Sequence, residues 1–322
     1  MKRHLCRLIA CACLLVPALL HAQTFPTKSV RVIVPYPPGG ITDVMTRTVA
    51  LEMAREFGQS FVVDNRPGAN SILGVDLLAK ASADGYTLGT VIAAHAANQT
   101  LYPKLPYDSI SSFEQVSLLG TAPLILCANN TLAANSVKEL VDLAKAKPGQ
   151  LTFASSGIGA AAHLTAELLM TTTGIKMVHV PYKGTAPALQ DLMGGQISLM
   201  MDTPSSLLPQ VRAGKIKALG MASEKRVAIA PEVPTLLEGG VPVVGGTWVG
   251  LLAPAGTPRA VVERLALAAG NAVRKPEINE RFVQLGIDPV GSSAPEFTRF
   301  LRAEVAKWAQ VIKDANVKID NY

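Results

Sequence analysis

Two glycine-containing loops carry the residues whose types and order could bind or transform a small molecule. The first reads Pro35-Tyr36-Pro37-Pro38-Gly39-Gly40-Ile41-Thr42-Asp43. Its paired prolines lack N–H groups and end the preceding strand, while its paired glycines can adopt positive φ and let another molecule approach the backbone. The following helix presents unpaired N–H groups and its positive dipole end, which favour an anion such as a carboxylate. The alternative is a rigid turn in which Thr42 or Asp43 caps the helix.

Asp43 complicates the anion site, because a carboxylate beside a bound carboxylate would repel it. The residue could cap the helix, hold a bridging water or meet an amine on the ligand. The sequence leaves these three roles open.

The second loop reads Ser155-Ser156-Gly157-Ile158-Gly159 and, with Ala162, completes a G-x-G-x-x-A string between a predicted strand and a predicted helix. A dinucleotide site would also need an acidic residue at the end of the next strand, roughly 20 residues on. That strand instead ends in His179-Val180-Pro181-Tyr182-Lys183. We therefore expect no nicotinamide or flavin cofactor, and the two serine hydroxyls suit a carboxylate better.

Two further loops follow predicted strands and precede predicted helices. Tyr182 and Lys183 offer an aromatic wall and a cation, although a packed tyrosine and a solvated lysine are an equal alternative. Asp202 or Thr203 would cap the helix that begins at Pro204, with a hydroxyl facing the cleft as the alternative.

Metal and catalytic signals are weak. His163 and Glu167 are four residues apart on one helix face, but without further ligands an ion pair is the better interpretation, and His163 could reach a ligand from beside the glycine loop. The G-x-S-x-G, H-E-x-x-H and Walker A strings are all absent. We expect His95 to face the crevice. A nucleophilic pair of Ser155 with either His163 or His95 stays open, although nothing orients the histidine. We predict no metal and no catalytic residue.

Short β-branched runs alternate with helical stretches, which predicts an α/β fold of mostly parallel sheets flanked by helices. The first unit is a strand at residues 30–34 followed by a helix at 41–57, and residues 258–315 are helical by composition. Further strands are expected at residues 61–63, 87–92, 124–128, 151–155, 177–180, 197–201, 216–221 and 248–252. The loops above lie at carboxyl ends of strands, where open α/β sheets bind ligands.

The N-terminus predicts export. Lys2, Arg3 and Arg7 precede an apolar run at residues 8–20, which is too short to span a bilayer and is typical of a signal peptide at residues 1–22. Cleavage is expected near Ala22, with Ala18 as the alternative. A lipidation box at residues 8–11 would leave too short an apolar segment before its cysteine. We therefore expect a soluble periplasmic protein.

Removing residues 1–22 leaves Cys127 as the only cysteine, in an apolar strand where an inert thiol is expected, and lowers the formal net charge from +6 to +3. A mild positive charge suits small anions, and no dense basic run indicates nucleic acid. About 300 residues exceed one comfortable core, so we expect two lobes.

Seven segments, taken in order, resemble the Bug family, the extracytoplasmic solute receptors of tripartite tricarboxylate transporters. They are Pro35 to Gly40 with Asp43, Val63-Asp64-Asn65-Arg66-Pro67-Gly68-Ala69, Asp84-Gly85-Tyr86-Thr87-Leu88, Leu105-Pro106-Tyr107-Asp108, Ala154-Ser155-Ser156-Gly157, His179-Val180-Pro181-Tyr182-Lys183-Gly184 and Ala253-Pro254-Ala255-Gly256-Thr257-Pro258. The resemblance covers essentially the whole mature chain.

The resemblance implies a two-lobed periplasmic-binding-protein fold that closes like a Venus flytrap, with loops 38–43 and 155–159 pinching a ligand carboxylate, partly through water. Tyr182, Lys183 and Asp202 would lie near the distal part of the ligand. So would Ala94, in a strand end, Ala93-Ala94-His95, that departs from the Ser/Thr-rich form of many relatives. The resemblance further implies a monomer that needs no cofactor and delivers its ligand to membrane permease subunits.

The lobes are expected at residues 23–122 plus 225–322 and at residues 123–224, with crossings near 121–124 and 222–225. Two other functions remain open: a sensor that signals to a membrane sensor kinase, and an exported serine hydrolase using Ser155 or Ser156. The sequence does not identify the carboxylate.

Overall fold

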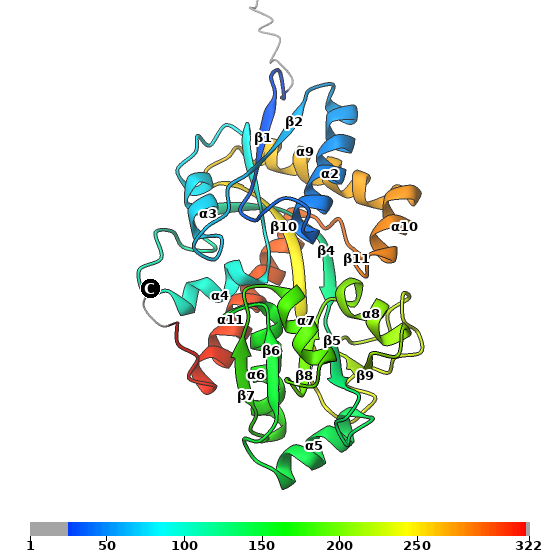
Figure 1. The fold of residues 1–322 in the computed structure, drawn as a ribbon. Helices are drawn as coiled ribbons and strands as arrows, with labels where there is room; N and C mark the ends of the chain where they lie inside the picture. Colours follow the sequence, from blue (N-terminus) through cyan, green and yellow to red (C-terminus); the bar gives the residue numbers. More distant parts are fainter. Residues whose placement is uncertain (1–24, 320–322) are drawn as a thin grey trace, which may run out of the picture.

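A computed structural model describes residues 25–319 as two α/β lobes, each built on its own sheet (Figure 1). The first lobe holds six strands in the order β11-β4-β10-β3-β1-β2. Its strands are β1 (Val30–Val34), β2 (Phe61–Asn65), β3 (Thr87–Val91), β4 (Phe113–Pro123), β10 (Gly246–Pro254) and β11 (Asp288–Pro289). β1 pairs in parallel with β2 and β3, whereas β10 is antiparallel to β3 and β4.

Helices cover both faces of this sheet, as the alternating pattern predicts. The helices are α2 (Ile41–Phe57), α3 (Ile72–Ala79), α4 (Ala93–Leu101), α9 (Arg259–Arg274), α10 (Pro276–Gln284) and α11 (Ala294–Asp314). One buried cluster joins α2 and α9 to one face, through Met45, Val49 and Leu265 among others. The other joins α3, α4 and α11 to the opposite face, through Leu78 and Trp308.

The second lobe holds five strands in the order β7-β6-β8-β5-β9. They are β5 (Ile125–Asn129), β6 (Thr152–Ser155), β7 (Val178–Pro181), β8 (Leu199–Asp202) and β9 (Ile216–Met221), with helices α5 (Val137–Ala146), α6 (Ala161–Thr173), α7 (Thr185–Met193) and α8 (Pro204–Arg212). β6 is parallel to β7 and β8, while β5 runs antiparallel to β8 and β9. The α/β class is thus confirmed, and both sheets are mixed because β5 and β10 run against their neighbours.

Two adjacent crossings connect the lobes. Leu124 lies between β4 and β5, and its backbone oxygen accepts the N–H of Ala222 at 2.8 Å. The Gly245 N–H donates to the Ala222 oxygen at 3.0 Å, and β10 begins one residue later. A side chain at Gly246 would lie 2.5 Å from the Ala122 oxygen, so the crossings approach each other more closely than a Cβ allows. The two crossing segments therefore lie side by side and form a narrow hinge.

The second crossing lies later in the chain than the sequence predicts. Val227, Ala230 and Val233 are buried in the core under α7 and α8, and Leu236 and Val243 are buried in the core with α5 and α6. Residues 225–244, expected in the first lobe, therefore pack on the second. Their apolar side chains are spaced by prolines and glycines, a pattern that resembles a surface connection although it covers a sheet.

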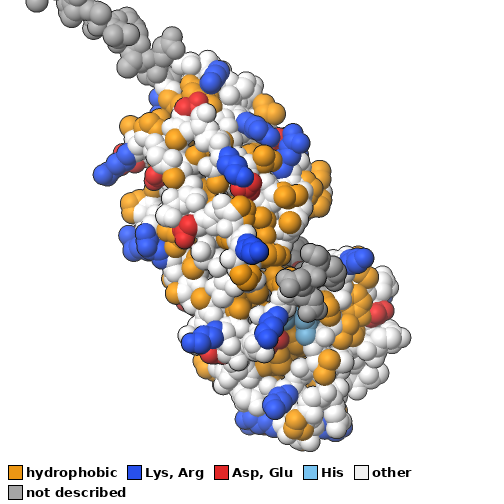
Figure 2. Space-filling model, turned by 90° about the vertical axis from the view of Figure 1, so that its left-hand side faces the viewer, with side chains coloured by type: hydrophobic (Ala, Val, Ile, Leu, Met, Phe, Trp, Pro, Cys, Tyr) orange, Lys and Arg blue, Asp and Glu red, His pale blue; other side chains and the backbone are white. Residues whose placement is uncertain are grey.

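No helix within residues 25–319 is both long and apolar enough to cross a membrane. The expected signal peptide lies outside the described residues. On the face drawn in Figure 2, Lys and Arg side chains are spread over both lobes with Asp and Glu among them.

Candidate functional site

The first glycine loop connects β1 to α2, which begins at the side of the first lobe nearest the second (Figure 1). Gly39 has φ +88° and Gly40 is the N-cap of the helix, with extended backbone. Pro38, Gly39 and Gly40 are exposed. Among residues 25–319, no group accepts the N–H of Gly40, Ile41 or Thr42. The helix start that we predicted as an anion site therefore has three N–H groups without an acceptor among the described residues.

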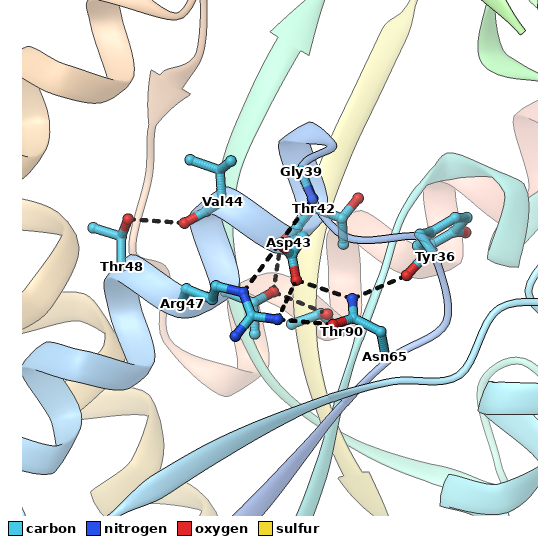
Figure 3. Close-up of polar contacts among 10 residues, drawn as sticks. Tyr36, Gly39, Thr42, Asp43, Val44, Arg47, Thr48, Asn65 and Thr90 are labelled. Atoms are coloured by element: carbon cyan, nitrogen blue, oxygen red, sulfur yellow. Dashed lines mark hydrogen bonds and ion pairs between the residues drawn. The ribbon is translucent and has the colours of Figure 1, made fainter.

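Asp43 braces this loop from within (Figure 3). Its side chain is almost completely buried and accepts the Gly39 N–H at 3.0 Å. Arg47 contacts both carboxylate oxygens, each at 3.0 Å, and the Asn65 amide donates to one at 2.9 Å. The same amide donates to the Tyr36 backbone oxygen at 3.0 Å, so the whole loop is tied to α2 and β2.

These contacts give Asp43 a role other than the three left open, and Gly40 is the N-cap of α2 in place of Thr42 or Asp43. Burial acts to raise the pKa of the carboxyl, but hydrogen bonds from Arg47, Gly39 and Asn65 outweigh it and hold the pKa below its usual value. The carboxylate is charged, neutralised by Arg47 and fully engaged. It holds the loop at the helix start and leaves the neighbouring N–H groups for another partner.

The second glycine loop connects β6 to α6 and repeats this arrangement. Gly159 has φ +78°, Ala160 is the N-cap, and the Gly159 N–H donates to Nδ1 of His163 at 3.1 Å. His163 is the third helical residue, as Asp43 is in α2. Its Nε2 lies 3.4 Å from Glu167. No group of three or more possible metal ligands occurs among the described residues.

Ser155 lies beneath the second loop and is completely buried. Its hydroxyl oxygen lies 3.0 Å from the Gly157 oxygen, to which it donates, and accepts the Gly157 N–H at 3.2 Å. His179 Nε2 lies 2.7 Å from the same hydroxyl, and its ring stacks on that of His163 at a centroid distance of 3.9 Å. Burial, together with His163, lowers the pKa of His179 to about 3. Ser155 therefore shapes the loop, while Ser156 is the partly exposed serine.

The two nucleophilic pairs considered from the sequence are wrong. His95 does not face a crevice: it is completely buried, and its Nε2 lies 2.9 Å from the Ser109 oxygen. Burial lowers the pKa of His95 to about 4. His163 has its Nδ1 occupied by Gly159, and Ser155 contacts His179 instead. The described residues near Ser155 thus form a structural network.

The other predicted residues surround the starts of three more helices. Tyr182 donates its hydroxyl to Asp191 at 2.6 Å, and burial raises its pKa to about 12, so only the ring is available. Lys183 is exposed. Asp202 is buried and accepts the Thr185 hydroxyl at 2.6 Å and the Thr203 N–H at 2.7 Å, and burial raises its pKa.

Ala94 lies in the first turn of α4, which begins directly after β3. It is buried and adds no polar group at this strand end. The position is therefore a small apolar wall beside the start of a third helix in the first lobe.

The structure adds one loop to those predicted from the sequence. Gly68, Ala69, Asn70 and Ser71 all have positive φ, which is costly outside glycine. Asn70 and Asn98 of α4 exchange hydrogen bonds of 2.8 and 2.9 Å that hold this conformation. The Gly-Ala-Asn-Ser string was a usable signal, because Gly and Asn adopt left-handed backbone most readily.

This loop and α4 meet the second glycine loop across the lobe boundary. A Cβ on Gly159 would lie 2.7 Å from Leu101 Cδ1 and 3.8 Å from the Asn70 amide nitrogen. On the other side, Gly286 of the first lobe lies against Pro204 at the start of α8. The lobes therefore touch at both sides of the strand ends that carry the loops.

A separate cavity of about 640 Å³ lies along the hinge. Both crossings line it, together with side chains of β11 and α11, and its lining includes Thr121, Ser223, Gly246, Trp248, Asp288 and Phe300. None of the predicted loop residues belongs to it.

Two mixed α/β lobes joined by a double crossing, with helix starts gathered at their facing strand ends, define a two-lobed periplasmic-binding-protein-like receptor. The chain belongs to the TctC family, described as the tripartite tricarboxylate transporter family receptor, whose model matches residues 45–317. This confirms the resemblance to Bug proteins.

Three solved structures support the assignment. The periplasmic binding protein BugD is 35% identical with a TM-score of 0.76, covering 91% of this chain and 99% of its own. Rpa4515 of Rhodopseudomonas palustris with adipate is 33% identical with a TM-score of 0.80, covering 91% and 99%. MatC of the same organism with bound malate is 32% identical with a TM-score of 0.76, covering 89% and 100%.

Proposed function

We propose that this protein is an exported receptor that captures a small carboxylate between loops 38–43 and 155–159 and delivers it to the membrane permease of a tripartite tricarboxylate transporter. The observation that carries the proposal is the pair of helix starts, each held by the third helical side chain. Asp43 and His163 take up the glycine N–H before the N-cap, and the following N–H groups of α2 remain free for an anion.

The ligand contacts follow from this arrangement. The N–H groups of Gly40, Ile41 and Thr42, together with Ser156 and Gly157, hold one carboxylate, directly or through water. Lys183, which is exposed, supplies a cation, while Tyr182 and Ala94 supply apolar wall. Asp202 is bonded to Thr185 and Thr203, and its role is to fix the start of α8. Adipate and malate in two relatives support this class of ligand.

Binding without chemistry is the function that the site supports. Ser155, whose hydroxyl contacts His179 of β7, is completely buried and makes two further hydrogen bonds to Gly157 of its own loop. The receptor acts as a monomer in the periplasm, where lobe closure gains from the expelled water and from hydrogen bonds made by both lobes.

The proposal is tested by a thermal-shift and calorimetric screen. The protein is first unfolded to remove any bound ligand and is then refolded. Malate and adipate are the first probes, followed by other mono-, di- and tricarboxylates. We expect at least one carboxylate to raise Tm, to bind with one-to-one stoichiometry and to be recovered intact by mass spectrometry. Absence of stabilisation by every carboxylate, or conversion of the bound one, would overturn the proposal.

A further inference from the structure

The two glycine loops are built alike but braced by different chemistry. In α2 the acceptor of the glycine N–H is the carboxylate of Asp43, which carries a charge and an Arg47 partner. In α6 it is a ring nitrogen of His163. A carboxylate accepts a hydrogen bond in its ordinary charge state, whereas an imidazole nitrogen accepts only while it carries no proton.

The surroundings fix the tautomer that this contact needs. His163 Nδ1 faces the Gly159 N–H at 3.1 Å, so the ring proton lies on Nε2, which is directed at Glu167 at 3.4 Å. The ring is almost completely buried between its own helix and the second sheet. Phe153 of β6 and His179 of β7 stack beside it, with centroid distances of 6.2 and 3.9 Å.

Among the described residues, two ionisable side chains contact the ring. Glu167 on the same helix lies 3.4 Å from Nε2, and the ring of His179 on β7 stacks at a centroid distance of 3.9 Å. His179 is held neutral by burial and by the adjacent ring. Protonation of this pair therefore reaches the glycine loop through His163, the member that accepts the Gly159 N–H.

We propose that His163 is a positioning residue that holds the second-lobe loop ready for the ligand through its unprotonated Nδ1, so that ligand affinity falls when His163 gains a proton. The inference rests on the proposed function. A protonated ring points a second N–H at the Gly159 N–H, and the loop loses its anchor next to Ser156 and Gly157. The same event leaves the first-lobe loop intact, because Asp43 keeps its charge.

The first test follows the Gly159 amide and needs no ligand. Hydrogen exchange by NMR should show this amide protected in the wild type at about pH 8 and less protected at about pH 5. His163→Leu, of similar size but without an acceptor, should expose the amide at both pH values. Equal protection in wild type and His163→Leu would overturn the proposal.

The second test measures carboxylate affinity by calorimetry at the same two pH values. His163→Leu should bind about tenfold more weakly at about pH 8, the size expected for a buried N–H without an acceptor. His163→Asn places an amide oxygen near the position of Nδ1 and should restore affinity and remove the pH dependence. His179→Gln, which alters the stacked ring but not the Gly159 contact, should keep the pH dependence.

These results separate the inference from the function on which it rests. A wild type that binds no carboxylate refutes the proposed function, while the amide exchange still decides the role of His163. A wild type that binds equally well at both pH values, or a His163→Asn variant with the pH dependence of the wild type, refutes the inference alone.

Discussion

The Asp43 carboxylate lies 3.0 Å from the backbone nitrogen of Gly39 and accepts its N–H from within the first turn of the same helix. This contact fixes the loop against the helix, because the Gly39 N–H, directly before the N-cap Gly40, donates to Asp43. The donors after it, on Gly40, Ile41 and Thr42, are left outside the intrahelical pattern. A carboxylate that would repel an anionic ligand thus becomes the group that prepares its site.

Asp43→Ala should loosen this loop and weaken ligand binding together. The substitution removes the acceptor shared by the Gly39 N–H, Arg47 and the Asn65 amide. All three contacts are only part-buried, so each should cost the net value of an ordinary hydrogen bond, about 0.5–1.5 kcal/mol. Asp43→Asn keeps one acceptor for Gly39 and should be intermediate in both properties. Urea unfolding and calorimetric titration measure the two effects. An Asp43→Ala protein as stable as the wild type would refute this role.

Mild acid should destabilise the protein through His95. Its pKa is lowered to about 4 by burial, so the folded state binds fewer protons than the unfolded chain. Stability is full above the ordinary histidine pKa of about 6.5 and is lost as pH falls toward the folded value. The midpoint of urea unfolding, followed from neutral to acid pH, should drop less steeply in His95→Gln than in the wild type. Parallel curves for the two proteins would assign the acid sensitivity elsewhere.

The sequence predicted the fold where local pattern and burial agree. Residues 30–34 and 41–57 form β1 and α2 with the expected bounds, because a β-branched run, a Pro-Gly loop and an apolar helical stripe all point to the same structure. β4 was missed, although it is the longest strand described. Its residues 113–123 are buried on both faces, and polar side chains such as Glu114, Gln115 and Ser117 interrupt the apolar ones, so the run lacks the alternation of a half-buried strand.

The loops were predicted as sites, but the tasks of their side chains were not. Ser155, His163 and Asp43 have the types expected of ligand contacts, and the structure turns all three inward to brace the backbone. A sequence gives the residue type at the third helical position and not the direction of its side chain. His179 contacts Ser155 because β6 pairs with β7, and no local sequence pattern predicts that pairing.

Glu304→Leu should strongly destabilise the first lobe. One oxygen of Glu304 accepts the indole N–H groups of Trp248 and Trp308, each at 2.9 Å, and Lys307 pairs with the other oxygen. Replacing the carboxylate leaves two buried indole donors unpaired, at about 1–3 kcal/mol each. Glu304→Gln retains one acceptor oxygen and should lose less.

Tryptophan fluorescence during urea unfolding follows this change directly, because both tryptophans of the chain take part. Glu296→Ala, which removes a capping contact at the start of the same helix, is the matched control and should cost about 1 kcal/mol. If Glu304→Leu were no less stable than Glu296→Ala, the shared acceptor would have no special weight.

Gly159→Ala should weaken ligand binding by keeping the lobes apart. The new methyl group would lie 2.7 Å from Leu101 Cδ1, which belongs to the other lobe, and φ of +78° adds strain within the loop. Gly157→Ala separates these effects, because it has φ of +143° but meets nothing nearer than the Tyr182 backbone oxygen at 3.9 Å, in its own lobe. Leu101→Ala in the Gly159→Ala background removes the clash and leaves the strain. We therefore expect Leu101→Ala to recover part of the carboxylate affinity, measured by calorimetry, in the Gly159→Ala background and none in the Gly157→Ala background. Equal recovery in both backgrounds would show that the contact between Gly159 and Leu101 does not limit closure.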